Sequence, residues 1–431
     1  MRARWVAAGI AAALLCAVPL PAAAAPGPPG HVEWWFDTWH VQHLWAEGAR
    51  GQGIVIGEID TGVAASLSTF SGHVLAGTDL GPGGGDGRRD RDVDPFGHGT
   101  AMASLMVAHD GPFGIVGLAP DARVLPVAVP ISGTTDDATS DSNPDLAEAI
   151  RFAVGHGAKI ISMSLGGSTD GDADHLSCPA DEQAAIDDAL SRGAIVVAAG
   201  GNSGDSGNPI EEPAVCLGVV SVGAVDSAGR VPPWSSRHPY LTVTAPGVNV
   251  PTVSRVAGTA FFGDGTSQAA AITSAGLAVI WSRYPKLTNR QVVARLLATL
   301  HGGRTTPSPA TGYGSIDIGA AVDRQVPANA PDPVFAAVDP FLGRDREQVP
   351  PPPAPPIQQA PRLREPAAVP SVPPAGPFAA GAGLAGLVGA AVGLIALVGL
   401  GMLAIGGRRR SRGRVGGFSS SVHPDGPGSA R

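Results

Sequence analysis

The chain has 431 residues, of which 44% are hydrophobic and only 15% are charged, so it can bury at least one large core. Its formal net charge of -8 comes from 29 basic and 37 acidic residues, and the central part holds no long basic run. This charge balance argues against a surface that tracks phosphates, so nucleic acid is not an expected partner. The 60 glycines and 41 prolines approach a quarter of the chain, which indicates that some segments are linkers.

The first 24 residues have the three parts of a secretory signal peptide. Arg2 and Arg4 give a positive start, residues 5–18 are mostly apolar, and residues 22–25 are all alanine. We expect cleavage after Ala24, which places the mature chain outside the cytoplasm. An uncleaved anchor helix is the alternative, but an apolar stretch of about 14 residues is short for a membrane span.

Residues 50–339 alternate between short apolar runs and longer helical patterns. The apolar runs, which suit buried parallel strands, are residues 54–59, 124–129, 159–165, 195–199, 219–222 and 241–244. The helical patterns are residues 99–108, 145–156, 181–192, 267–284 and 288–299. This alternation predicts an α/β domain with an open parallel sheet that carries helices on both faces. Catalytic groups in such sheets gather at the carboxyl ends of the strands.

Residues 340–377 are expected to form a spacer. Twelve of the 29 residues in 349–377 are proline, a composition that favours an extended polyproline II conformation. A proline-rich docking site is the alternative, although PxxP patterns arise by chance at this density.

A transmembrane helix is predicted over residues 378–407, which contain no charged residue. Five arginines follow at once within residues 408–414, whereas residues 345–377 before the helix carry three acidic and three basic residues. This asymmetry places the tail, residues 408–431, in the cytoplasm and everything before the helix outside. We therefore expect a single-pass protein of the cell membrane, with a buried core helix as the alternative reading of 378–407.

Cys178 and Cys216 are the two cysteines that remain once the signal peptide is removed. Outside the cytoplasm such a pair predicts a disulfide, and two buried free thiols are the alternative.

Three short segments stand where a catalytic site is expected. Asp60 ends the first apolar run and precedes a glycine turn, His98 lies between two glycines at the start of a helix, and Ser267 opens a long small-residue helix. Acyl transfer needs a nucleophile, a base, and an acid that holds the base in its tautomer, and these three side chains supply those roles. Asn202 follows an apolar strand and two glycines, and its amide can donate to an oxyanion.

In this order the segments resemble the subtilisin-like serine proteases, on the blocks DTGV, GHGT, SMSLGG, AAGGN and GTSQAA between Trp45 and Val322. The resemblance implies the subtilisin-like fold, with Ser267 as nucleophile, His98 as general base and then acid, Asp60 as its orienting acid and Asn202 as oxyanion donor. It also implies that Ser164, Leu165 and Gly166 pair with the backbone of an extended polypeptide substrate.

Three departures from that family affect the expected activity. Ala271 stands where GTSxAxP has proline, and AAGGN replaces the usual AAAGN, so we expect Ala271 and Gly201 to alter the rigidity of the site. The third departure is the short segment before the core, residues 25–49, which cannot hold a folding pro-domain.

The whole layout is similar to the mycosins, the membrane-anchored subtilisin-like proteases that are associated with type VII secretion systems of actinobacteria. The resemblance implies a disulfide between Cys178 and Cys216, the processing of secreted substrates and a structural contribution to the secretion complex. It also implies that the extension packs against the catalytic domain through Trp34, Trp35, Trp39 and Trp45. This is compatible with an ordinary amphipathic first helix over the core.

No cofactor is expected, because the histidines and cysteines show no metal-ligand spacing with one another. The loop 79–94 carries five aspartates, but three arginines lie among them and the EF-hand spacing is absent, which favours a solvated loop over a structural calcium site.

Two hypotheses on function follow. The first is an active, membrane-anchored serine endopeptidase, which the four retained chemical groups favour. The second is a catalytically idle subtilisin-like scaffold of a membrane secretion complex, which Ala271, Gly201, the anchor and the short extension favour.

Overall fold

A computed structural model describes residues 32–131, 134–135, 145–168 and 178–340 of the protein. The expected signal peptide, transmembrane helix and cytoplasmic tail lie outside these residues, as does almost all of the spacer. Within the described ranges, no helix combines the length and the apolarity that a membrane crossing requires.

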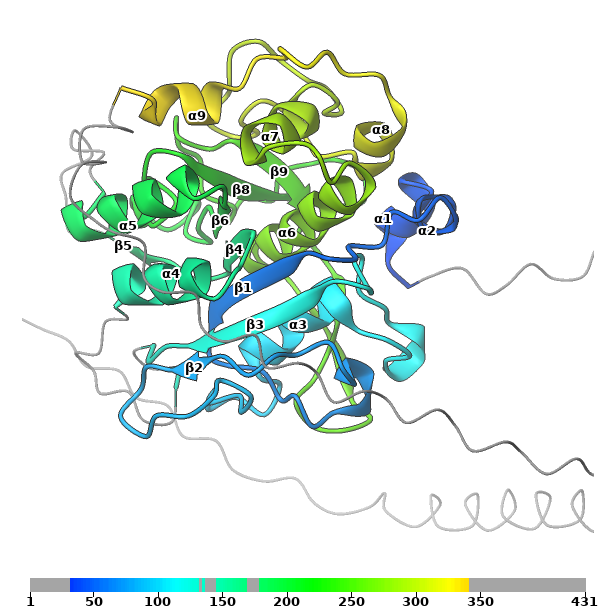
Figure 1. Cartoon of the computed structure of the whole chain (residues 1–431), viewed down its shortest axis with the longest axis vertical. Coiled ribbons are helices and arrows are strands. Elements are labelled where there is room, and N and C mark those ends of the chain that lie inside the picture. The colour runs from blue at the N-terminus through cyan, green and yellow to red at the C-terminus, as the bar shows by residue number, and fades with distance from the viewer. Residues whose placement is uncertain (1–31, 132–133, 136–144, 169–177, 341–431) are drawn as a thin grey trace, which may run out of the picture. The chain divides into compact units, whose positions relative to one another are not determined.

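The described residues form one α/β unit (Figure 1). Its α-helices are α1 (Trp34–Thr38), α2 (Val41–Ala46), α3 (His98–Val107), α4 (Leu146–Gly155), α5 (Ala180–Ser191), α6 (Thr266–Arg283), α7 (Asn289–Leu297), α8 (Ile318–Asp323) and α9 (Pro333–Val338). Its strands are β1 (Val55–Asp60), β2 (Thr78–Asp79), β3 (Arg123–Ala128), β4 (Ile160–Met163), β5 (Gly167–Ser168), β6 (Ile195–Ala199), β7 (Glu211–Glu212), β8 (Val219–Val225), β9 (Val243–Pro246), β10 (Val250–Val253) and β11 (Ala260–Gly263). Two 3₁₀ turns, η1 (Ser68–Phe70) and η2 (Pro112–Gly114), complete the set.

The main sheet has seven parallel strands in the order β2-β3-β1-β4-β6-β8-β9. All six predicted strands are in it, which confirms the parallel α/β fold class. β4, β6, β8 and β9 are buried along their whole length, as expected when helices cover both faces of a sheet. The five predicted helices are also present as α3 to α7, with ends that shift by two residues or less.

The two faces of β1 meet different helices. A Cβ at Gly57 would come within 2.8 Å of the Ala153 side chain, so this face packs against α4. Because side chains alternate along a strand, Glu58 and Asp60 face the other side, where α3 lies. Figure 1 shows α4 and α5 side by side, with α3 and α6 on the far side of β1.

The N-terminal tryptophans pack against the folded domain, as expected. Trp35 is 1% exposed, and the Trp45 indole N–H donates to the carbonyl oxygen of Leu118 at 3.0 Å. A Cβ at Gly319 in α8 would lie 2.5 Å from the carbonyl oxygen of Trp39. The extension is therefore part of the same core as the sheet and its helices.

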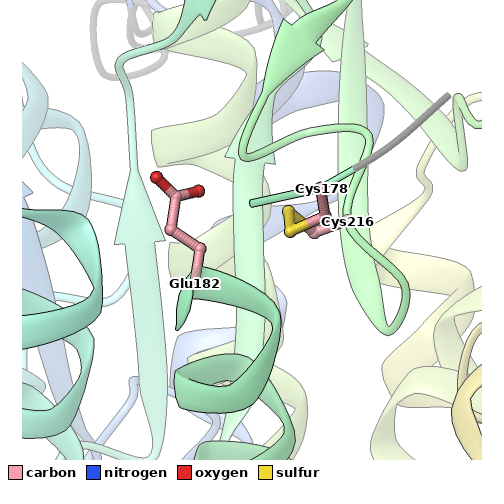
Figure 2. A group of neighbouring side chains, drawn as sticks. All are labelled: Cys178, Glu182 and Cys216. Carbon is pink, nitrogen blue, oxygen red and sulfur yellow. A yellow bond between two sulfur atoms is a disulfide. The ribbon is translucent and has the colours of Figure 1, made fainter. Parts of the chain in front are cut away.

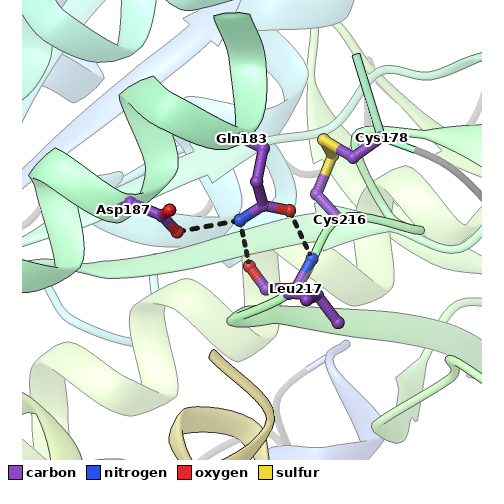
Figure 3. The surroundings of a disulfide bond; sticks show 5 residues. All are labelled: Cys178, Gln183, Asp187, Cys216 and Leu217. Carbon is purple, nitrogen blue, oxygen red and sulfur yellow. Dashed lines mark hydrogen bonds between the residues drawn. A yellow bond between two sulfur atoms is a disulfide. The ribbon is translucent and has the colours of Figure 1, made fainter. Parts of the chain in front are cut away.

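Cys178 and Cys216 form a disulfide in the structure, with Glu182 of α5 beside it (Figure 2). Gln183, the next residue of α5, exchanges two hydrogen bonds with the backbone of Leu217 and donates a third to Asp187 (Figure 3). The disulfide segment is thus held to the first turns of α5.

Candidate active site

Asp60 and His98 are in direct contact, although 38 residues separate them in the chain. Asp60 ends β1 and His98 begins α3, and the distance from Asp60 Oδ1 to His98 Nδ1 is 2.7 Å. Asp60 is 1% exposed and also accepts the backbone N–H of Thr61 at 2.8 Å. A buried carboxylate on Nδ1 leaves Nε2 of the imidazole available as a base.

Two glycines allow this contact to form. A Cβ at Gly99 would lie 2.2 Å from the carbonyl oxygen of Gly62, and a Cβ at Gly62 would lie 2.2 Å from the carbonyl oxygen of Arg89. Gly62 also has a φ of +95°, in the region that favours glycine. The glycines of DTGV and GHGT therefore let the β1 turn and the start of α3 pass within contact distance.

Asp90 and Asp92 correct the expectation of a fully solvated loop at 79–94, because they are only 3% and 6% exposed. Asp90 accepts the hydroxyls of Thr61 and Thr100 and the backbone N–H groups of Asp92 and Thr100, at 2.5 to 3.0 Å. Asp92 accepts the backbone N–H of His98 at 2.7 Å. These carboxylates hold the loop to the start of α3, a role that the charged string RRDRDVD did not reveal.

The electrostatics of this region favour a protonated imidazole. Burial by itself lowers the pKa of His98, but the charge and hydrogen bond of Asp60 and the charges of Asp92 and Asp90 raise it to about 9. The imidazolium that forms during acyl transfer is therefore stabilised by the surrounding carboxylates.

Glu58 is a further acid on the same face of β1, and no sequence motif distinguishes it from the apolar run around it. It is 2% exposed, and neither carboxyl oxygen has a hydrogen-bond partner of good geometry in the described part of the chain. Burial, followed by the charges of Asp60 and Asp90, raises its pKa well above the usual range. Burial therefore favours the neutral form of Glu58.

Ser267 is the second residue of α6, which packs against α3 and β1. Its hydroxyl donates to the carbonyl oxygen of Ser164 at 2.8 Å, and the Ser164 hydroxyl donates to the carbonyl oxygen of Ser267 at 3.0 Å. Its backbone N–H belongs to the first turn of a helix, where amides have no acceptor within the helix. This amide and the positive end of α6 suit a developing negative charge.

The orientation of Asn202 is set by Thr266, the first residue of α6. Both the backbone N–H and the hydroxyl of Thr266 donate to Asn202 Oδ1, at 2.8 and 3.0 Å. With its oxygen held in this way, the exposed Asn202 directs its NH₂ group elsewhere and can donate. Thr266 was not among the predicted site residues, although it lies in the block GTSQAA.

The expected substrate segment connects β4 with β5. Ser164 is buried through its contact with Ser267, Leu165 is half-buried and Gly166 is exposed. Their place at the carboxyl end of β4 follows the rule for parallel sheets.

The expectation that Gly201 is the departure from AAAGN is wrong, because Gly201 is the glycine that this block itself contains. Gly201 has a φ of +107°, and a Cβ there would come within 2.5 Å of Glu211 Cγ. The residue that departs from AAAGN is the third of the block, Gly200, where a Cβ would meet the Leu241 side chain at 2.7 Å. Ala271 is fully buried within the continuous helix α6, so both glycines and this alanine occupy tightly packed places.

A model of the Subtilase family, peptidase S8, matches residues 51–314. Subtilisin DY from Bacillus licheniformis is 34% identical over 59% of this chain and 86% of its own length. Mycosin-3 from Mycobacterium tuberculosis is 32% identical over 65% of this chain and 69% of its own length.

Solved structures agree with these sequence matches. The MycP3 protease of the type VII (ESX-3) secretion system has a TM-score of 0.59 at 29% identity and covers 70% of this chain and 90% of that one. MycP1 of the ESX-1 type VII secretion system has a TM-score of 0.60 at 26% identity and covers 70% and 88%. The similarity thus extends to the mycosins as well as to the subtilisins.

Proposed function

Because the chain belongs to the subtilase family of serine endopeptidases, we propose that it cleaves extended polypeptides with an Asp60–His98–Ser267 triad. The observation that carries this assignment is the 2.7 Å contact between Asp60 and Nδ1 of His98. It gives the imidazole the tautomer that a general base requires.

We derive the proposed reaction from the chemistry of the four groups. His98 Nε2 takes the Ser267 hydroxyl proton, which must first turn from the Ser164 carbonyl, and Oγ attacks the peptide carbonyl carbon. The oxyanion accepts from the Asn202 amide and the Ser267 backbone N–H. His98 then protonates the leaving amine. In the second half of the reaction, His98 takes a proton from water, the water oxygen attacks the acyl carbon, and His98 returns the proton to Ser267 Oγ as the acid product leaves. Apart from the substrate and the water molecule, every reacting group in this scheme belongs to the chain, so we expect no cofactor.

Hydrolysis of an unstructured polypeptide such as casein tests this assignment. We expect the purified full-length protein to cleave casein and Ser267→Ala to abolish cleavage, whereas Ser227→Ala, an exposed serine, leaves it unchanged. Asn202→Ala should lower kcat by about 10²–10³-fold with little change in KM, because the oxyanion forms only after attack. Equal cleavage by Ser267→Ala and the wild-type protein would contradict the proposal.

We further propose that the protein is secreted, anchored by residues 378–407, and acts with a type VII secretion system. The support is the pattern of an apolar N-terminus, a proline-rich spacer and an uncharged 30-residue run before arginines, together with the names of the related mycosin structures. Secretion in a deletion strain and in a Ser267→Ala strain separates the two roles. Loss of substrate processing alone in Ser267→Ala cells, with loss of secretion in deletion cells, supports both roles, and normal secretion in the deletion strain contradicts the secretion role.

A further inference from the structure

Glu211 lies beside the expected substrate segment, although 45 residues separate it from Gly166. It begins β7, which pairs antiparallel with β5, so that Ser168 is opposite Glu211 and Gly167 is opposite Glu212. β5 directly continues the segment Ser164–Gly166. The Glu211 backbone N–H donates to the Tyr240 hydroxyl at 3.0 Å, which fixes the start of β7.

The side chain of Glu211 lies between two glycines of the candidate active site. A Cβ at Gly166 would come within 3.3 Å of Glu211 Oε2, and a Cβ at Gly201 would come within 2.5 Å of Glu211 Cγ and 3.0 Å of Cδ. Gly166 ends the substrate segment, and Gly201 precedes the oxyanion donor Asn202. The carboxyl group is therefore enclosed by the two segments that would contact the substrate.

A substrate bound for cleavage directs one side chain toward this place. Its scissile carbonyl must reach Ser267 Oγ with the oxygen on Asn202, while its backbone lies along Ser164–Gly166. The side chain one bond away from that carbonyl then passes between residues 164–166 and 201–202. Neither glycine carries a side chain that would block it, and Glu211 lies at the end of its path.

The carboxyl group of Glu211 has no cationic partner among the described residues. The residue is 7% exposed, and no hydrogen bond or ion pair to the carboxylate joins it to a residue of the described part. Burial, followed by the charge of Glu212, raises the pKa of Glu211. Glu182 and Glu212 interact electrostatically with each other and with Asp181, so the surrounding potential is negative.

We propose, on the basis of the peptidase function above, that Glu211 selects an arginine or lysine on the acyl side of the bond that is cleaved. A guanidinium or ammonium group supplies both the charge and the hydrogen-bond donors that the enclosed carboxylate lacks among the described residues. A neutral side chain of similar length supplies no compensating charge, and an acidic one is repelled.

The test uses the purified full-length protein and tetrapeptide p-nitroanilides, succinyl-Ala-Ala-Pro-X, in which X is Arg, Lys, Gln, Met or Glu. We expect kcat/KM for Arg and Lys to exceed that for Gln and Met by about tenfold or more. In the Glu211→Gln variant, the ratio of kcat/KM for the Arg substrate to kcat/KM for the Gln substrate should fall by about tenfold or more. Glu212→Gln, which removes the neighbouring charge from the same strand, is the matched control and should change the ratio less than about threefold.

Labelling by a fluorophosphonate, which needs only an assembled serine nucleophile, separates the two proposals. A labelled wild-type protein without a preference for Arg or Lys, or a labelled Glu211→Gln variant with an unchanged ratio, would overturn the role of Glu211 alone. An unlabelled wild-type protein would overturn the peptidase function and this inference with it. If Glu211→Gln is not labelled, the role of Glu211 is tested by the wild-type preference for Arg or Lys and by the Glu211→Asp variant. Asp keeps the charge on a shorter side chain, so Glu211→Asp should keep a preference for Arg and Lys over Gln and Met.

Discussion

Two acidic regions flank the candidate active site, and they are built in opposite ways. Beside His98, the buried Asp90 accepts four hydrogen bonds from threonine hydroxyls and backbone amides. Beside the expected substrate segment, Glu211 is also buried, and so is Glu182, which interacts electrostatically with the neighbouring Glu212. The described residues include no cation paired with Glu211 or Glu182, and one oxygen of Glu182 has no hydrogen-bond partner among them. The first region has its donors built in and fixes the loops around His98. The second has no paired cation among the described residues, which suits the binding of a cationic side chain of the substrate.

Removal of the Asp90 carboxylate should have the largest effect, because four donors lose their acceptor at once. We expect Asp90→Ala to lower the free energy of unfolding by about 3–5 kcal/mol, measured by urea denaturation. Asp86→Ala is the matched control, since Asp86 is an exposed aspartate of the same loop and should cost about 0.5 kcal/mol or less. An equal loss of unfolding free energy in the two variants would contradict the structural role assigned to Asp90 beside His98.

Glu182 should show the opposite behaviour, because its burial is uncompensated. Burial and the charges of Glu212, Asp181 and Asp145 raise its pKa from 4.5 to about 7. The folded state therefore binds more protons than the unfolded state in this window, and the stability that Glu182 contributes is lost as the pH rises through about 7. Relative to the wild type, Glu182→Gln should gain about 1–3 kcal/mol between pH 5 and pH 8.

Thermal unfolding at the two pH values measures this gain. Glu148→Gln, an exposed glutamate of α4, provides the control and should show no gain that depends on pH. If Glu182→Gln is less stable than the wild type at pH 8, the carboxylate has a stabilising partner and the contrast between the two regions fails.

The smallest expected effect concerns the pH dependence of catalysis. Since the base form of His98 is required and its pKa is raised to about 9, kcat/KM for peptide hydrolysis should increase with pH up to about 9. Asp92→Asn removes one of the charges that raise this pKa, so the rising limb should move to lower pH. Asp94→Asn, an exposed neighbour in the same loop, should leave the limb in place, and an identical limb for all three proteins would contradict the electrostatic role of Asp92.

The parts of this molecule that could be predicted from sequence are those with a local physical signature. A strand buried on both faces is an apolar run, so the sequence predicts six of the seven strands of the main sheet, all except the two-residue β2. Asp60 ends β1, whereas His98 and Ser267 lie in the first turns of α3 and α6, and all three stand within short glycine-containing blocks. The place of Asp60 at the carboxyl end of a parallel strand follows the rule for such sheets.

The parts that could not be predicted depend on pairings between distant segments. The burial of Asp90 is produced by Thr61 and Thr100, and its neighbours Arg88, Arg89 and Arg91 make the string look solvated. Glu211 reaches the site through two strands of two residues each, and such short strands have no periodicity to detect. Contacts between distant segments of the chain therefore determine the burial and the position of the acids in both regions.

Fluorophosphonate labelling of the purified full-length protein tests the central claim most directly, because it requires Ser267, His98 and Asp60 to act together. The triad predicts labelling of the wild-type protein, none of Ser267→Ala and far slower labelling of His98→Ala. A folded wild-type protein that is not labelled, or a Ser267→Ala variant that is labelled as fast as the wild type, would contradict the triad. The first of these results would favour a subtilisin-like scaffold in place of the peptidase.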